Sequence, residues 1–167
     1  MGKIKPSVFD AGPFIHLSEI DILNHLTIFQ SIFVTEEVLE ECKQIREKIQ
    51  QQKNIVIKEL FAVNKDFAKY LIERYNLHLG ESTGIALCKQ EKISLFFTDD
   101  LEARETAILL GFEAHGTLAI ILRSLREKII TKHEAKEIIE KLYQKSTLFF
   151  TRDLKEWTIK EIEKYNH

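Results

Sequence analysis

Residues that interrupt regular structure are scarce in this sequence. Its 167 residues include six glycines and two prolines, and both prolines, Pro6 and Pro13, lie near the start. No glycine-, proline- or serine-rich stretch marks a linker, and no repeat or low-complexity tract stands out. This length suits one domain with a substantial core. We therefore expect a single domain over residues 1–167, with its core at about 4–128 and a C-terminal helical extension at 129–167.

Long apolar runs and cysteines are also few. A run such as residues 117–122 is far shorter than the roughly 20 residues that a membrane span needs. Residues 1–6 contain no apolar segment and no small-residue cleavage site, so we expect neither export nor membrane insertion. The two cysteines, Cys42 and Cys88, lie singly inside helical patterns. Buried, reduced thiols are the simplest interpretation, and they indicate a cytoplasmic protein.

A surplus of positive charge is missing. The chain has 24 basic and 26 acidic residues, giving a net charge of −2. Nucleic-acid-binding proteins usually carry a basic surplus, because neutralising phosphates drives their affinity. The balance therefore argues mildly against an RNA partner. It also fits a chain in which several acids are committed to a metal ion and the basic residues cluster elsewhere.

The segments that are present alternate between strand and helix patterns. The predicted strands are residues 4–9, 32–34, 54–60, 93–97 and 112–114. The predicted helices are residues 12–26, 36–50, 65–75, 81–89, 100–110, 117–128, 131–144 and 153–165, with a glycine turn at Gly80. This alternation predicts an α/β fold, a three-layer α/β/α sandwich with a central, mostly parallel sheet. In open parallel sheets, functional sites form beyond the carboxyl ends of the strands.

Acidic residues follow two of the predicted strands directly. Asp10 comes after the first strand, and Asp99 and Asp100 come after the most apolar strand in the chain. Carboxylate oxygens are the ligands that hard cations such as Mg²⁺ prefer. An aspartate after a strand also commonly caps the next helix, so each position taken alone supports both interpretations. Two such positions at one edge of a sheet favour a metal site.

Two glutamates on predicted helices are further candidates. Glu41 lies one helical turn from Val38 and Ile45, at the border of an apolar stripe, whereas most glutamates on helices simply face solvent. Glu81 follows Gly80 at the start of its predicted helix. A carboxylate is favoured there by the helix dipole, with or without a metal ion.

The order in which these acid-bearing segments follow one another along the chain resembles that of a PIN domain. This is the nuclease fold of the toxins in VapBC-type toxin–antitoxin pairs. The resemblance is strongest to a prokaryotic subgroup of toxin-like proteins. It spans about residues 8–125, and no single motif within it is decisive. The segments that carry it are residues 8–17, 35–41, 79–87, 97–104 and 111–118.

The resemblance implies a Mg²⁺- or Mn²⁺-dependent ribonuclease that hydrolyses RNA phosphodiester bonds. Carried over position by position, it makes Asp10, Glu41, Glu81 and Asp100 the catalytic acids and metal ligands. Asp99 is an additional acid, so which of the neighbours Asp99 and Asp100 binds the metal stays open. The resemblance further implies a homodimer and an antitoxin protein as partners.

Three other residues are weaker candidates for substrate contact. Thr98 would orient the Asp100 carboxylate or touch the substrate. Arg104, four residues after Asp100, would form an ion pair with it or contact a phosphate. Thr117 begins a predicted helix whose free N–H groups would suit an RNA phosphate. No role is assigned to His16, His78, His115 or His133, because they lack metal-ligand spacing.

Two alternatives remain at this point. Many PIN domains have a hydroxyl residue after the first aspartate, whereas this chain has Ala11 and Gly12. That difference supports a catalytically silent PIN-like module that binds RNA or a protein. A receiver or phosphoryl-transfer domain also places aspartates at strand ends, but the chain has no Asp-x-Asp at the first strand and no convincing late lysine.

Overall fold

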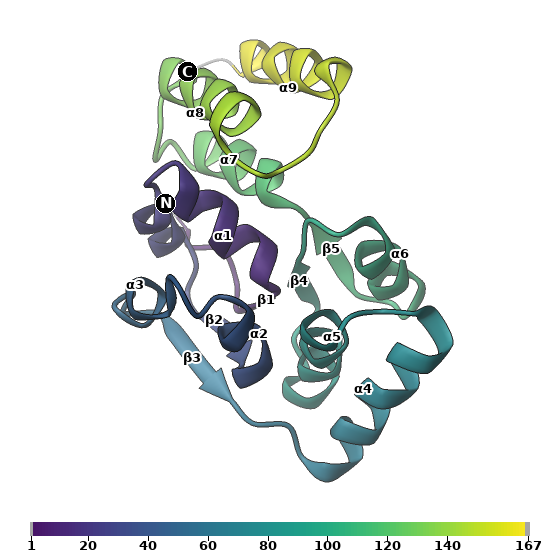
Figure 1. The fold of residues 1–167 in the computed structure, drawn as a ribbon. Helices are drawn as coiled ribbons and strands as arrows, with labels where there is room; N and C mark the ends of the chain where they lie inside the picture. Colours follow the sequence, from purple (N-terminus) through teal and green to yellow (C-terminus); the bar gives the residue numbers. More distant parts are fainter. Residues whose placement is uncertain (1, 166–167) are drawn as a thin grey trace.

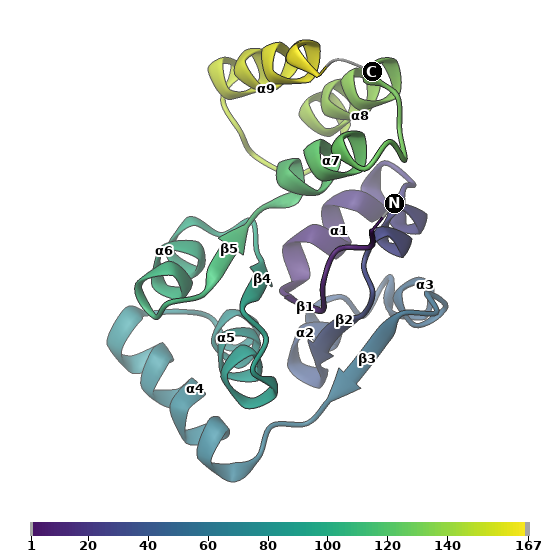
Figure 2. The same ribbon diagram turned by 180° about the vertical axis from the view of Figure 1, so that it is seen from behind.

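Five short strands form one parallel sheet in the computed structural model, which describes residues 2–165. The strand order is β3-β2-β1-β4-β5, and all neighbouring pairs are parallel. The strands are β1 (Ser7–Phe9), β2 (Ile32–Thr35), β3 (Ile55–Lys58), β4 (Leu95–Phe97) and β5 (Glu113–His115). Helices cover both faces (Figures 1 and 2), which confirms the predicted three-layer α/β/α arrangement. Residue 1 and residues 166–167 of the predicted domain lie outside the described residues.

One face of the sheet packs against α4 (Ala62–Tyr75), α5 (Leu79–Glu91) and α6 (Leu101–Leu109). Side chains of a strand point alternately to the two faces, and Val8 and Phe96 point to this one. Both are fully buried. The helix α5 is buried along most of its length, so it holds its N-terminal residues firmly against the sheet.

The opposite face packs against α1 (Ala11–Glu19), η1 (Leu23–Ile28), α2 (Glu36–Glu41), α3 (Arg46–Gln50) and α7 (Thr117–Arg126). Phe9, Phe29 and Phe97 form its centre, with ring centroids 5.0–5.1 Å apart. Tilted and edge-on contacts of this kind suit the charge distribution of aromatic rings. Both predicted strand ends at Phe9 and Phe97 are therefore anchored by aromatic packing.

The C-terminal helices α8 (Lys132–Lys145) and α9 (Arg152–Lys164) follow α7. They gather at the top of Figure 1, in green and yellow. Ile139, Leu142 and Ile162 are fully buried and belong to the same apolar cluster as Phe9. The extension is thus attached to the α1 and α7 side of the sheet through shared core packing.

Two predicted helices are wrong in extent. The helix expected at 36–50 is divided into α2 and α3, because the chain between them makes tighter bonds, with the Lys43 and Ile45 N–H groups donating three residues back. The helix expected at 12–26 ends at Glu19. Asp21 follows with a φ of 61°, a left-handed conformation that aspartate tolerates better than most residues.

Other features of the sequence are confirmed. Cys42 and Cys88 are buried free thiols. Thr35 and Thr131 cap α2 and α8 through their side-chain hydroxyls. Within residues 2–165, no helix has the combination of length and apolar content that crossing a bilayer requires.

Candidate active site

The carboxyl ends of β1 and β4 lie side by side, because the two strands pair with Phe9 opposite Phe97. Asp10 therefore reaches the same edge as Thr98, Asp99 and Asp100. Asp10 is only 5% exposed. Its Oδ1 accepts the Ala11 N–H at 2.8 Å, and its Oδ2 accepts the Thr98 hydroxyl at 2.8 Å. Both oxygens have a donor, so the missing hydroxyl at Ala11 leaves neither of them unpaired.

Burial and neighbouring acids together raise the pKa of the Asp10 carboxyl from 3.8 to about 7. Burial is the largest cause, and the carboxylates of Glu81 and Glu41 add to it, while the bonds from Thr98 and Ala11 work in the opposite direction. Two acids from α2 and α5 are thus close enough to Asp10 to disfavour its charged form.

Glu81 lies in the first turn of α5 and is 8% exposed. Its Oε2 accepts the His78 N–H at 2.8 Å, and its Oε1 lies 3.4 Å from His78 Nδ1. This is a capping box that fixes the start of the helix. Burial raises the pKa of Glu81, and the Asp100 carboxylate raises it further. Glu81 is therefore coupled both to Asp10 and to Asp100.

Glu41, at the end of α2, is exposed, and its Oε1 accepts the Gly80 N–H at 3.0 Å. A Cβ at position 80 would overlap that oxygen and lie 2.8 Å from Glu41 Cδ. The turn predicted at Gly80 is wrong, because this residue lies within α5. Glycine is needed there so that the carboxylate can reach the backbone.

Thr98 joins the two strand ends. It is fully buried, its hydroxyl donates to Asp10, and its oxygen accepts the Asp100 N–H at 3.2 Å. Of its two predicted roles, the contacts agree with orienting a carboxylate, and that carboxylate is Asp10 and not Asp100. Asp100 itself is exposed and caps α6, with Oδ1 accepting the Ala103 N–H at 2.8 Å. We call Asp10, Glu41, Glu81 and Asp100 the acidic edge.

Asp99 faces a different way from its neighbour. Its Oδ1 accepts the Thr117 N–H and its Oδ2 the Thr117 hydroxyl, each at 2.6 Å. His16 Nδ1 lies 2.6 Å from the same Oδ2. A Cβ at Gly116 would come within 2.7 Å of Oδ1, so a glycine is required beside this carboxylate. We call Asp99, His16 and Thr117 the Asp99 clamp, which ties the end of β4 to α1 and α7.

The clamp changes the interpretation of two residues. Thr117 is fully buried and gives both its donors to Asp99, so the predicted phosphate contact at the start of α7 is replaced by an internal carboxylate. His16, to which no role was assigned, is a partner of Asp99. It lies 83 positions away in the chain, and no spacing rule connects the two.

Arg104 lies in α6, four residues after Asp100, beside the Asp99 clamp. Among the described residues it forms no ion pair with Asp100, contrary to one of its two predicted roles. Its Nη2 donates to the Asp99 backbone oxygen at 3.4 Å, and its buried Nε has no partner in the part of the chain that the structure describes. The guanidinium therefore lies against the Asp99 backbone and Gly116, with one unpaired donor inside the protein.

The acidic edge has the donor type that Mg²⁺ or Mn²⁺ requires, namely carboxylate oxygens that repel one another. In the described conformation, no three His, Cys, Asp or Glu side chains of residues 2–165 are arranged to hold an ion. The oxygens of Glu41, Glu81 and Asp100 accept backbone N–H groups instead. Cavities of about 500, 340 and 330 Å³ are lined by other residues. Metal binding thus stays a prediction.

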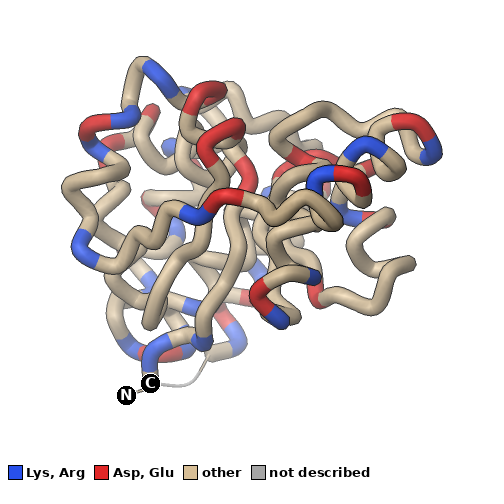
Figure 3. Tube along the Cα trace, turned by 90° about the horizontal axis from the view of Figure 1, so that it is seen from below, with Lys and Arg blue, Asp and Glu red and all other residues tan. Residues whose placement is uncertain are grey.

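Charge is mixed over the rest of the molecule. Figure 3 shows acidic and basic segments interspersed along the trace, in keeping with the net charge of −2. The acidic edge is therefore a local feature, produced by the convergence of β1, β4, α2 and α5 at one end of the sheet.

A family model, DUF3368, described as a PIN domain, matches residues 6–164. The match covers nearly the whole chain, and the protein belongs to the PIN-domain family. It includes α8 and α9, beyond the 8–125 segment of the resemblance. Family membership sets aside the receiver-domain alternative. Comparison with curated proteins gives no match.

Proposed function

We propose that this protein is a divalent-metal-dependent endoribonuclease of the PIN type, which hydrolyses RNA phosphodiester bonds at the acidic edge. The observation that carries the proposal is that Glu41, Glu81 and Asp100 come from separate segments to the edge at which Asp10 is buried. Thr98 links Asp10 to the Asp100 backbone, and Gly80 links Glu41 to the helix that carries Glu81. PIN domains are generally nucleases, which agrees with this chemistry.

Asp10 and Asp100 would hold the Mg²⁺ or Mn²⁺ ion, with Glu41 and Glu81 acting through water molecules. When bound, the ion supplies an activated water and offsets negative charge at the scissile phosphodiester. The raised pKa of Glu81 makes its carboxylate a suitable acceptor for a proton from that water. Thr98 keeps Asp10 in one orientation, and the partly exposed Arg104 would offer the N–H groups of its Nη atoms to a substrate phosphate.

The partners follow from the resemblance to VapC-like toxins. A second copy of the chain and an antitoxin protein are the binding partners we propose, in the cytoplasm. Light scattering coupled to size-exclusion chromatography tests the first of these directly: a mass twice that of the 19.6 kDa chain supports a homodimer, and a mass of one chain opposes it.

An RNA cleavage assay tests the activity. The purified protein is incubated with single-stranded RNA in Mn²⁺, in Mg²⁺ and in excess chelator, beside an Asp10→Ala variant purified in the same way. The proposal expects cleavage by the wild type with either metal and none with chelator or with Asp10→Ala. Equal cleavage by both proteins would point to a contaminant. RNA binding without cleavage in any condition would favour the catalytically silent module instead.

A further inference from the structure

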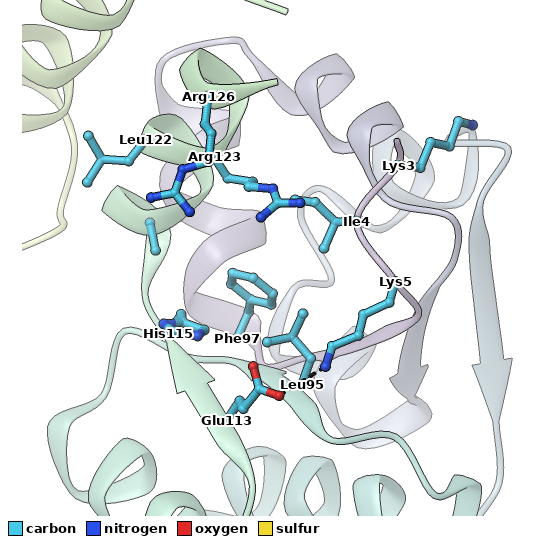
Figure 4. A pocket seen from close by; sticks show the side chains of 11 residues that line it. Lys3, Ile4, Lys5, Leu95, Phe97, Glu113, His115, Leu122, Arg123 and Arg126 are labelled. Carbon is cyan, nitrogen blue, oxygen red and sulfur yellow. Dashed lines mark hydrogen bonds and ion pairs between the residues drawn. The ribbon is translucent and has the colours of Figure 1, made fainter. Parts of the chain in front are cut away.

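A second polar site lies on the α7 side of the sheet. It is a cavity of about 500 Å³ between β4, β5, the segment before β1 and α7, and we call it the α7 cavity (Figure 4). Its described lining contains none of the four acids of the acidic edge. Cavities that bind small molecules commonly have volumes of roughly 300–1,000 Å³. The α7 cavity is therefore large enough for a ligand of its own.

Two arginines of α7 dominate one wall of this cavity. Arg123 and Arg126 lie three residues apart, and Figure 4 shows both guanidinium groups extending over the Phe97 and His115 rings. Arg123 Nη2 pairs with Glu127 at 2.6 Å, and Arg126 Nη2 donates to the Tyr165 hydroxyl at 3.1 Å. Each guanidinium has five N–H donors. Both arginines thus retain donors in the fork geometry that matches phosphate oxygens.

One of these donors is conspicuously unused. Arg123 Nε is buried, and it has no hydrogen-bond partner among the described residues. The Arg123 side chain as a whole is 41% exposed, so a ligand in the cavity would meet its Nη groups and not the buried Nε. The arrangement therefore favours a ligand that brings anionic oxygens to α7.

The opposite wall and the floor have a different character. Lys5 Nζ bonds Glu113 Oε1 at 2.9 Å and Ser94 Oγ at 3.1 Å, so the only carboxylate in the described lining is already paired. The floor carries the Phe97 ring and the exposed His115 ring, with centroids 5.9 Å apart. Phe97 is only 4% exposed and packs with Phe9 and Phe29, so the ring that a ligand can reach is that of His115. An aromatic face beside a cationic wall is a surrounding in which a nucleobase stacks.

We propose that the α7 cavity binds a nucleoside monophosphate, with its phosphate on Arg123 and Arg126 and its base against the His115 ring, beside the buried Phe97. The same chemistry occurs in a free nucleotide and in the phosphorylated end of an RNA strand. The site is separate from the acidic edge, so the inference goes beyond the proposed nuclease activity and does not depend on it.

Calorimetric titration with the four ribonucleoside 5′-monophosphates, in chelator and at low salt, tests the inference. We expect at least one nucleotide to bind, and Arg123→Gln and Arg126→Gln each to weaken it roughly tenfold or more, as for lost charge-assisted bonds. Arg123→Lys keeps the charge without the fork and should fall between wild type and Arg123→Gln. Glu113→Gln should tighten binding, because it removes the negative charge and releases Lys5.

Two control variants locate the site. Arg152→Gln alters an arginine of α9 that pairs with Glu156 outside the cavity, and it should leave nucleotide affinity unchanged. Asp10→Asn should also leave it unchanged. A 5′-phosphorylated oligoribonucleotide that displaces the nucleotide identifies an RNA end as the source, and failure to displace it identifies the free nucleotide.

Four results would overturn the inference. They are no nucleotide binding by the folded wild type, equal binding by both arginine variants, loss of binding in Asp10→Asn, and inorganic phosphate binding as tightly as any nucleotide. The last of these would remove the base-binding part, and with it the assignment of His115.

Discussion

Asp10 and Asp99 follow neighbouring strands at one edge of the sheet, yet their surroundings differ. Asp10 is buried beside the carboxylates of Glu41 and Glu81, which together with burial raise its pKa to about 7. The oxygens of Asp99 face the N–H and hydroxyl of Thr117 and the ring of His16. Both carboxylates accept hydrogen bonds at both oxygens, but only Asp10 also has other carboxylates beside it.

The contrast separates two uses of the same residue type. An acid whose hydrogen-bond partners come from other segments, with no second carboxylate beside it, holds those segments together. An acid surrounded by other acids is costly in its charged form until a cation arrives. Position after a strand does not distinguish the two, so the charged groups beside each carboxylate are the informative feature. The predictions below test whether this division holds.

The largest expected effect concerns the adjacent pair Asp99 and Asp100. We expect Asp100→Asn to reduce RNA cleavage by roughly 10²–10³-fold, as when a group that stabilises transition-state charge is removed. Asp99→Asn should retain activity within about tenfold, because it keeps the oxygen that accepts the Thr117 N–H. Initial cleavage rates of the two purified variants in Mn²⁺ check this. The reverse order would make Asp99 the ligand and remove the contrast.

The second effect is a pH dependence of stability due to Asp10. Its folded pKa of about 7 lies above the ordinary 3.8, so the folded state loses stability as the pH rises from about 4 to 7, and the cost is complete above pH 7. Asp10→Asn mimics the protonated form. We expect it to stabilise the metal-free protein by on the order of 4 kcal/mol at pH 8 and by little at pH 4.

Denaturant unfolding at the two pH values, in chelator, measures this difference. Added Mg²⁺ should stabilise the wild type and leave Asp10→Asn unchanged, since binding to the folded state alone raises stability. A variant less stable than wild type at pH 8 would show that Asp10 is held by favourable contacts, as Asp99 is.

The third effect is the loss of the Asp99 clamp. Asp99→Ala leaves the Thr117 N–H, the Thr117 hydroxyl and His16 without their partner, and we expect a destabilisation of about 3 kcal/mol. Asp100→Ala removes a helix cap from an exposed position and should cost about 1 kcal/mol. Urea unfolding of both variants compares them. Equal losses would mean that the clamp contributes no more than an ordinary cap.

The smallest effect concerns Gly80. The added methyl group of Gly80→Ala must displace the Glu41 carboxylate, whose end is exposed and free to move. We expect stability within about 1 kcal/mol of wild type, because alanine also favours the helix. Cleavage should fall about as far as in Glu41→Gln. If Gly80→Ala is fully active while Glu41→Gln loses activity, Glu41 does not act from the position in which it accepts the Gly80 N–H.

Strand periodicity was sufficient to predict the sheet and the two strand ends that carry Asp10 and Asp100, because apolar strands end where polar residues begin. The direction of side chains at that edge was not predictable. His16 meets Asp99 only through tertiary packing of α1 against β4, and Gly80 looks like a turn until the Glu41 carboxylate is seen above it. The break between α2 and α3 was also hidden, since their apolar stripe continues through it.

The most direct test is anomalous diffraction from crystals soaked in Mn²⁺. The account predicts a peak at the acidic edge, touching oxygens of Asp10 and Asp100, and none at Asp99. A peak coordinated by Asp99, or none at the edge in crystals that have taken up Mn²⁺, would contradict it.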